Sequence, residues 1–308
     1  MPLPQEFHDL ARTVNNWGRW GEDDQRGTLN LVTADAVRRG VAAAVSGDVV
    51  PLALPLSADG PQAGLVPGRD NPTHRMTQVN EPMLGDPTLV STSDGAIDLS
   101  LQAATHWDAL CHVSYDGRLY NGQDPAVVTA GGATALSIDR LGPVVSRGVL
   151  LDVPRALGLD VLAPGHALTP DDLDAAAEFG GVTIAPGDIV LVRTGQIRAF
   201  HAGDRIAYAF PSAGPSMQTV PWFDRHDVAA VATDNLTFEV FPGEREDAVL
   251  PVHLLHLVEM GLTQGQNFDL EVLAERCAED RRHTFLLSAT PEPVVGGVGA
   301  PVAPVAIR

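Results

Sequence analysis

The sequence is poor in positive charge. Only 20 Lys and Arg residues face 39 Asp and Glu residues, so the chain of 308 residues carries a formal net charge of −19. Such a surface repels phosphate backbones and anionic lipid, and no basic cluster interrupts it. The charge balance therefore predicts no nucleic-acid partner and favours a small neutral or weakly charged substrate.

Long hydrophobic runs are missing as well. No stretch of about 18 consecutive apolar residues occurs, which predicts that the chain does not span a membrane. The first residues, 1–9, lack a basic segment followed by an apolar one, so we expect no signal peptide. The two cysteines, Cys111 and Cys277, show no framework spacing, which is typical of reduced thiols in a cytoplasmic protein.

Several well-known catalytic motifs are also absent. Neither G-x-G-x-x-G nor G-K-[ST] occurs, so nothing indicates a loop that binds nucleotide phosphates. No G-x-S-x-G turn is present, which weakens the hypothesis of a serine hydrolase. The apolar fraction of 44% nevertheless supports a packed core and argues against disorder.

What the sequence does contain is a dense polar motif between Gln102 and His112. The run 96–101 reads as a strand, and if it continues, Gln102, His106 and Asp108 point to the same side. His112 follows Asp108 by four residues and reaches the same place if the chain turns. An imidazole and a carboxylate that converge in this way are typical of a metal site or of a polarised water.

The other elements are mixed in order, which predicts one α+β or loosely α/β domain over residues 1–308. An N-terminal arm (1–32) contains Trp17 and Trp20, and a Gly- and Pro-rich loop (58–94) is long enough to serve function or assembly. Helices are predicted over about 34–46, 170–178, 250–260 and, after a cap at Asp269, 270–279, and strands over 49–56, 149–153, 187–195, 228–232, 285–288 and 301–307.

The motif at 102–112 resembles the signature His-x-Gly-Thr-His-x-Asp-x-x-x-His of a cyclase family that includes bacterial kynurenine formamidases and isatin hydrolases. Segments that also resemble its longer branch, of roughly 300 residues, lie at 17–30, 115–122, 187–195, 233–235, 250–253 and 296–304. The residues that match the signature are Gln102, Ala104, Thr105, His106, Asp108 and His112.

This resemblance implies a swivelling β/β/α fold that assembles as homodimers or homotetramers. It also implies a divalent metal, zinc or manganese, used to hydrolyse a small amide or lactam. Carried over by position, His106 and Asp108 would be metal ligands, His112 the general base, and His253 the distal histidine of the site. We expect Trp107 or the N-terminal tryptophans to contact the substrate.

Two positions depart from the family pattern. Gln102 stands where the first ligand histidine is expected, and Gln266 falls at or beside the distal glutamate. Amides bind Zn²⁺ poorly, although an amide oxygen can bind a harder ion such as Mn²⁺. The site therefore holds metal weakly or has lost it. Glu239 is the nearest carboxylate that could replace the missing one, and Asp234 either serves the site or holds a turn.

Three hypotheses follow from these residues. The first is a metal-assisted hydrolase of a small cyclic or aromatic amide, lactam, ester or lactone, with His112 as base and His253 and Gln266 in the site. The second is a metal-independent cyclase, dehydratase or isomerase that uses His106, Asp108 and His112 for acid–base chemistry. The third is a binder of small molecules without catalysis.

Overall fold

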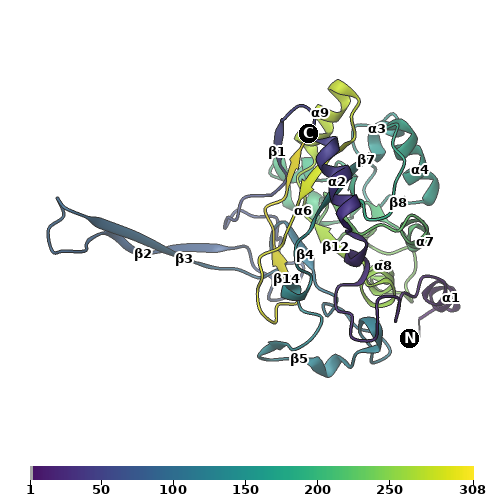
Figure 1. The fold of residues 1–308 in the computed structure, drawn as a ribbon, viewed down its shortest axis with the longest axis horizontal. Helices are drawn as coiled ribbons and strands as arrows, with labels where there is room; N and C mark the ends of the chain where they lie inside the picture. Colours follow the sequence, from purple (N-terminus) through teal and green to yellow (C-terminus); the bar gives the residue numbers. More distant parts are fainter. Residues whose placement is uncertain (1–2) are drawn as a thin grey trace.

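The computed structural model describes residues 3–308 and has a nine-stranded sheet at its centre (Figure 1). Its inner strands β7, β9, β11 and β12 run parallel, and the outer pairs are antiparallel. This arrangement confirms the predicted α+β class. In spatial order the strands are β1 (Val49–Pro51), β15 (Val305–Ile307), β13 (Thr284–Ser288), β7 (Val145–Asp152), β9 (Ile189–Arg193), β11 (Ala230–Thr233), β12 (Thr263–Gln266), β4 (His106–Asp108) and β14 (Gly299–Pro301).

The sheet is buried on both faces. Successive side chains of a strand point to opposite sides, so Leu150 and Leu191 join one hydrophobic core while Val149 and Val190 join the other. All four are fully buried. The near-continuous apolar runs of β7 and β9 are typical of parallel strands covered on both faces.

Helices cover the sheet, and their starts follow the sequence signals. Thr33 accepts a hydrogen bond from the backbone N–H of Ala36, and Thr169 forms a capping box with Asp172. Within residues 3–308, no helix is long and apolar enough to cross a membrane. The helices are α1 (Gln5–Thr13), α2 (Ala34–Ala43), α3 (Val153–Ala156), α4 (Pro170–Phe179), α5 (Ile197–His201), α6 (Arg205–Ala209), α7 (Val220–Arg225), α8 (Pro251–His253) and α9 (Glu271–Asp280).

Three predicted boundaries need correction. α2 ends at Ala43 rather than near residue 46, because the N–H groups of Ser46 and Gly47 bond to the carbonyl of Arg308 instead of continuing the helix. The predicted helix 250–260 is a short α8 followed by a π-helix, Leu254–Met260. α9 begins one residue later than predicted, although the carboxylate of Asp269 still accepts from the N–H of Glu271.

A long β-hairpin projects from the body (Figure 1). Its strands are β2 (Thr73–Pro82) and β3 (Ser91–Asp98), and we call residues 73–98 the arm. The prediction of a structureless loop over 58–94 is therefore wrong for its second half. Four further two-residue strands form two small sheets, β5 (Val128–Thr129) with β6 (Gly132–Ala133), and β8 (Ala167–Leu168) with β10 (Gly214–Pro215).

The polar motif does not lie on one continuous strand. β3 ends at Asp98, the chain then turns, and β4 comprises only three residues from His106 to Asp108. The predicted alternation that placed Gln102 on the same strand face as His106 is therefore wrong. The chain is extended as a strand only where the neighbouring strands β12 and β14 supply hydrogen-bonding partners. Both of them pair with β4 at His106.

Candidate functional site

The structure gathers four polar side chains around the carboxylate of Asp108. β4 places His106 and Asp108 on one face of the sheet, and Gln266 of β12 is the register partner of His106. The Nε2 atoms of His106 and His112 lie 3.6 and 3.7 Å from Asp108 Oδ1. On the other oxygen, Gln266 Nε2 donates to Oδ2 at 2.7 Å, and His253 Nε2 lies 4.0 Å away.

Asp108 stays ionised in this setting although it is fully buried. Burial alone would raise its pKa, but the imidazoles of His112, His106 and His253 outweigh it and bring the pKa well below its ordinary value. Burial also lowers the pKa of His112, against the pull of the Asp108 carboxylate. The site therefore combines a permanent negative charge with a histidine that is neutral at neutral pH.

Two of the histidines have fixed tautomers. A backbone carbonyl can only accept, so His106 must donate through Nδ1 to the oxygen of Ala104, 2.6 Å away. His253 likewise directs Nδ1 at the carboxylate of Glu239, which also accepts the backbone N–H of Val252 at 3.0 Å and that of His253 at 2.9 Å. Both Nε2 atoms are therefore free to accept a hydrogen bond beside Asp108.

The unpartnered atoms converge on one position. Among residues 3–308, His106 Nε2 and Asp108 Oδ1 are buried polar atoms that lack a hydrogen-bond partner. Both are acceptors, and the 3.6 Å between them suits a group that donates two hydrogens, such as a water molecule or an alcohol. This position lies next to His112, so the site can place a nucleophile beside a base.

A cavity of about 300 Å³ opens onto this cluster. His112, His253 and Gln266 form its polar floor, and Arg69 contributes a cation whose pKa is lowered by burial. The walls are mainly apolar, which fits a small aromatic or aliphatic compound. The other lining residues are Leu65, Val66, Ala209, Leu236, Thr237, Phe241, Val249 and Leu250.

The two amides face an imidazole and a carboxylate rather than a shared ion. Gln102 Nε2 lies 3.5 Å from His112 Nδ1, and Gln266 occupies one Asp108 oxygen with its NH₂ group. Within residues 3–308, no three or more His, Cys, Asp and Glu side chains are arranged to hold a metal ion. The residues present therefore do not fit the donor set that the resemblance implies, and Gln102 lies beside His112 rather than in a ligand shell.

None of the three tryptophans that we expected to contact the substrate lines the cavity. Trp107 alternates with its neighbours on β4, so its ring points into the core, where Nε1 donates to the carbonyl of Ala289 and the ring packs edge-on against Phe268. Trp17 donates through Nε1 to the carbonyl of Val258, and Trp20 stacks with Arg19 on the surface. The predicted substrate contact of Trp107 is wrong because the strand turns this side chain away.

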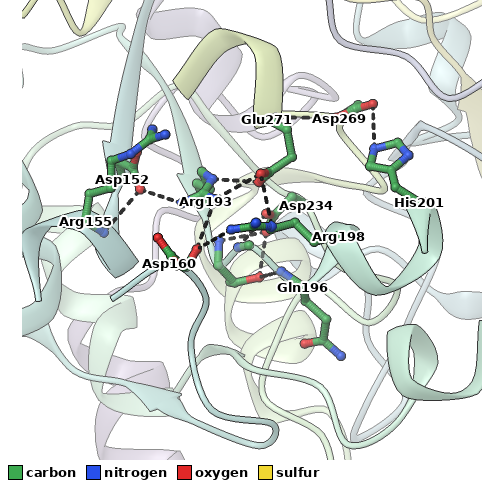
Figure 2. A network of polar contacts seen from close by, with 12 residues as sticks. Asp152, Arg155, Asp160, Arg193, Gln196, Arg198, His201, Asp234, Asp269 and Glu271 are labelled. Carbon is green, nitrogen blue, oxygen red and sulfur yellow. Dashed lines mark hydrogen bonds and ion pairs between the residues drawn. The ribbon is translucent and has the colours of Figure 1, made fainter. Parts of the chain in front are cut away.

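One residue of the site, Arg69, was not predicted from the sequence, and two candidate residues, Glu239 and Asp234, have roles of their own. Arg69 carried no local signal beyond the length of the loop that contains it. Glu239, proposed as a replacement carboxylate, instead orients His253. Asp234 holds a turn, since it accepts from the backbone N–H groups of Thr194 and Gly195 (Figure 2), and burial raises its pKa to about 6.

Other histidines lie away from the floor of the cavity. His256 is buried between the rings of Phe223 and Phe238 and does not line the cavity. His283 is buried against the carbonyl of Leu150. Cys111 next to His112 is a buried thiol whose pKa burial raises to about 11, so it is not a thiolate nucleophile.

Restoring an imidazole at position 102 tests how close this position is to a metal site. We expect Gln102→His to raise the affinity for Zn²⁺ at least about tenfold. Even the loss of a residue that only orients a metal ligand lowers metal affinity by about this factor, so the gain of a direct ligand should matter at least as much. The added imidazole would join His106 and Asp108 to make a three-ligand set. Isothermal titration calorimetry measures this, with Gln102→Asn as the matched control. Unchanged affinity in Gln102→His would show that residue 102 cannot reach the ligand position.

Comparisons with known proteins show the family and the fold of the chain. The model of the Cyclase family, described as "Putative cyclase", matches residues 18–240. The crystal structure of a novel cyclase is 33% identical, with 100% of both chains covered and a TM-score of 0.88. No curated protein sequence matches.

Two more distant structures share the fold. An isatin hydrolase bound to the product analogue thioisatinate is 18% identical, covers 90% of this chain and 99% of its own, and gives a TM-score of 0.62. A predicted metal-dependent hydrolase from Bacillus stearothermophilus is 17% identical, with 84% and 97% covered and a TM-score of 0.54.

Proposed function

Because this chain belongs to the Cyclase family, we propose that it is an enzyme that hydrolyses a small carbonyl compound, an aromatic or cyclic amide, lactam, ester or lactone. One observation carries the proposal: an ionised, buried Asp108 lies among three imidazoles at the floor of a mainly apolar cavity. The cavity of about 300 Å³ suits a molecule of one or two rings. Isatin hydrolase, a distant relative in fold, is named for a substrate of this class.

The residues of the floor divide the work of hydrolysis. A water between Asp108 Oδ1 and His112 Nε2, which are 3.7 Å apart, can donate one O–H to each when the Gln102 amide turns its oxygen toward His112 Nδ1, because the ring hydrogen then sits on Nδ1 and leaves Nε2 free to accept. As the water oxygen attacks the carbonyl carbon, His112 takes its proton, and the Asp108 carboxylate stabilises the imidazolium that forms. His112 then returns the proton to the leaving nitrogen or oxygen.

The developing oxyanion needs a positive partner. Arg69 lines the same cavity and is the cation among its lining residues, so we assign it this role. His253, oriented by Glu239, lines the cavity on the Oδ2 side of Asp108, where its Nε2 can accept a hydrogen bond from the substrate. Gln266 holds Asp108 in place from the other side. The proposed steps use these side chains alone, and none runs through a metal ion.

A second candidate is elimination of water or ring closure by the same side chains. What favours it is that Asp108 and His112 form an acid–base pair without a metal donor set around them. A screen of N-formyl amines, isatin-like lactams and lactones, read by mass spectrometry, separates the two candidates. Hydrolysis adds 18 Da to the substrate, dehydration removes 18 Da, and isomerisation leaves the mass unchanged. Parallel runs with a chelator and with added Zn²⁺ or Mn²⁺ test whether an ion takes part.

The pH dependence follows from the burial of His112. Burial lowers its pKa below the ordinary value of 6.5, although Asp108 opposes this. A general base works only when neutral, so activity is lost as the pH falls through this lowered pKa. We expect the acid limb of kcat/KM to have its midpoint below pH 6.5, measured on the free enzyme at constant ionic strength. A midpoint above pH 6.5 would exclude His112 as the group that titrates.

A further inference from the structure

Gln102 is a buried residue whose amide faces the proposed base, His112. Its side chain belongs to a residue that is 7% exposed, and its Nε2 lies 3.5 Å from His112 Nδ1. Among residues 3–308, His112 Nδ1 has no other hydrogen-bond partner. On the opposite edge of the ring, Nε2 lies 3.7 Å from Asp108 Oδ1, a carboxylate oxygen without a partner of its own. Gln102 and Asp108 therefore determine which nitrogen of His112 carries the ring hydrogen.

The other two histidines of the site show how a tautomer is set here. His106 donates through Nδ1 to a backbone carbonyl, and His253 directs Nδ1 at a carboxylate. In both rings an acceptor at Nδ1 leaves Nε2 free beside Asp108. His112 repeats this geometry, with Gln102 at the place of the acceptor. All three rings thus turn Nε2 toward the same carboxylate.

An amide can face an imidazole with either an acceptor or a donor. Its oxygen accepts and its NH₂ group donates, and a half-turn about the last side-chain bond exchanges them. With the oxygen toward His112, the ring hydrogen sits on Nδ1 and Nε2 can take a proton. With the NH₂ group toward His112, the hydrogen moves to Nε2, which can then only donate. The negative charge of Asp108 attracts the hydrogen to Nε2, so the basic form needs an acceptor at Nδ1.

The surrounding chain holds the Gln102 amide next to His112. A Cβ atom at Gly299 would lie 2.5 Å from Gln102 Nε2, so only glycine leaves room for the amide at this point of β14. The segment that carries Gln102 is fixed as well, because the buried Gln62 donates through Nε2 to the carbonyl of Ala103 at 2.8 Å. The amide therefore has a defined place from which it can present its oxygen to the ring.

From this arrangement we propose that Gln102 is a positioning residue whose amide oxygen accepts the Nδ1 hydrogen of His112 and thereby makes Nε2 the base. The inference rests on the proposed hydrolysis, because a general base needs a free Nε2. When the water oxygen bonds to the carbonyl carbon, its proton goes to Nε2, and the bond to Gln102 stabilises the imidazolium. The same proton then goes to the leaving nitrogen or oxygen as its bond to carbon breaks. A neutral amide does this without placing a second negative charge beside Asp108.

Nitrogen NMR tests where the hydrogen sits, without any substrate. In protein labelled with ¹⁵N at its ten histidines, proton–nitrogen spectra distinguish a ring nitrogen that carries hydrogen from one that does not, and His112→Ala identifies the signals of His112. At neutral pH we expect the hydrogen on Nδ1 in the wild type. In Gln102→Met, which keeps nearly the same shape without the amide, we expect it on Nε2, because the charge of Asp108 then has no competitor. Hydrogen on Nε2 in the wild type, or on Nδ1 in Gln102→Met, overturns the proposal.

Steady-state kinetics on the best substrate of the screen test the consequence. We expect Gln102→Met to lower kcat by roughly 10- to 10⁴-fold with KM little changed, the upper limit being the cost of a wrong tautomer in a Ser-His-Asp triad. Gln102→Glu, which offers only acceptors, should recover part of this loss. Gln5→Met makes the same change at an exposed residue of α1 and should match the wild type. Equal losses in Gln102→Met and Gln102→Glu, or no loss in Gln102→Met, would refute the positioning role. If the screen yields no substrate at all, the hydrolase proposal fails, and the NMR spectra still decide the position of the hydrogen.

Discussion

His112→Ala is expected to reduce kcat/KM by about 10²- to 10⁴-fold, the range that a positioned general base contributes. His112 Nε2 faces Asp108 Oδ1, the carboxylate oxygen that lacks a hydrogen-bond partner, and its ring lines the cavity, so it joins the buried charge to the substrate space. Without it, the attacking water keeps its proton until bulk solvent removes it. The loss should appear in kcat, while KM changes little, because the apolar walls that bind the substrate stay in place.

The control for this variant is another histidine beside a carboxylate. His166 Nε2 lies 3.4 Å from Asp172, but it does not line the cavity, so His166→Ala should keep nearly all of the activity. Steady-state kinetics on the best substrate of the screen measures both variants, and circular dichroism confirms that both are folded. If His112→Ala retained activity within about threefold of the wild type, the base would have to be another residue, with His253 the nearest alternative.

The sequence predicts the parts of this protein whose causes are local. Thr33 and Thr169 mark helix starts because a side-chain oxygen satisfies a backbone N–H within three residues. The spacing of His106, Asp108 and His112 is short enough that one strand end and one turn bring them together, as the motif predicts.

Features that depend on distant partners were not predictable in this way. Glu239 reaches His253 only because the chain folds back across 14 residues, and nothing near either residue signals it. The position of Gln102 was not predictable because β4 is only three residues long, and its register is set by its neighbours β12 and β14 rather than by β3. The arm was read as a loop because its alternating polar pattern has no buried face to reveal a strand.

The site at Asp108 depends on a stable central sheet. A second cluster of buried charges, around Arg193, helps to stabilise this sheet. Arg193, at the end of β9, is 1% exposed and binds two carboxylates (Figure 2). It donates through Nη1 to Asp152 at 2.8 Å and through Nε to Glu271 at 2.7 Å. Because Asp152 belongs to β7 and Glu271 begins α9, this one side chain joins two central strands to a helix.

Arg193→Ala is therefore expected to lower the free energy of unfolding by about 3–5 kcal/mol, the usual cost of removing one partner from a buried ion pair. Asp152 is fully buried and would keep only Arg155, which donates to its other oxygen at 2.7 Å. Glu271 would lose a bidentate partner at the first turn of α9. Urea unfolding followed by circular dichroism measures the loss. Arg193→Lys should recover part of it, because a single ammonium group cannot bind both carboxylates with the same geometry.

The matched control is an arginine with similar contacts outside the core. Arg245 also binds a carboxylate through two nitrogens, donating to Asp247 at 2.8 Å from each, but both side chains are exposed. Water and salt screen exposed pairs, so Arg245→Ala should leave the midpoint of urea unfolding unchanged within experimental error. Equal effects of the two variants would mean that Arg155 alone neutralises Asp152. Burial, rather than the number of hydrogen bonds, is thus what should separate them, since water can replace the lost partner at Asp247 and cannot reach Asp152.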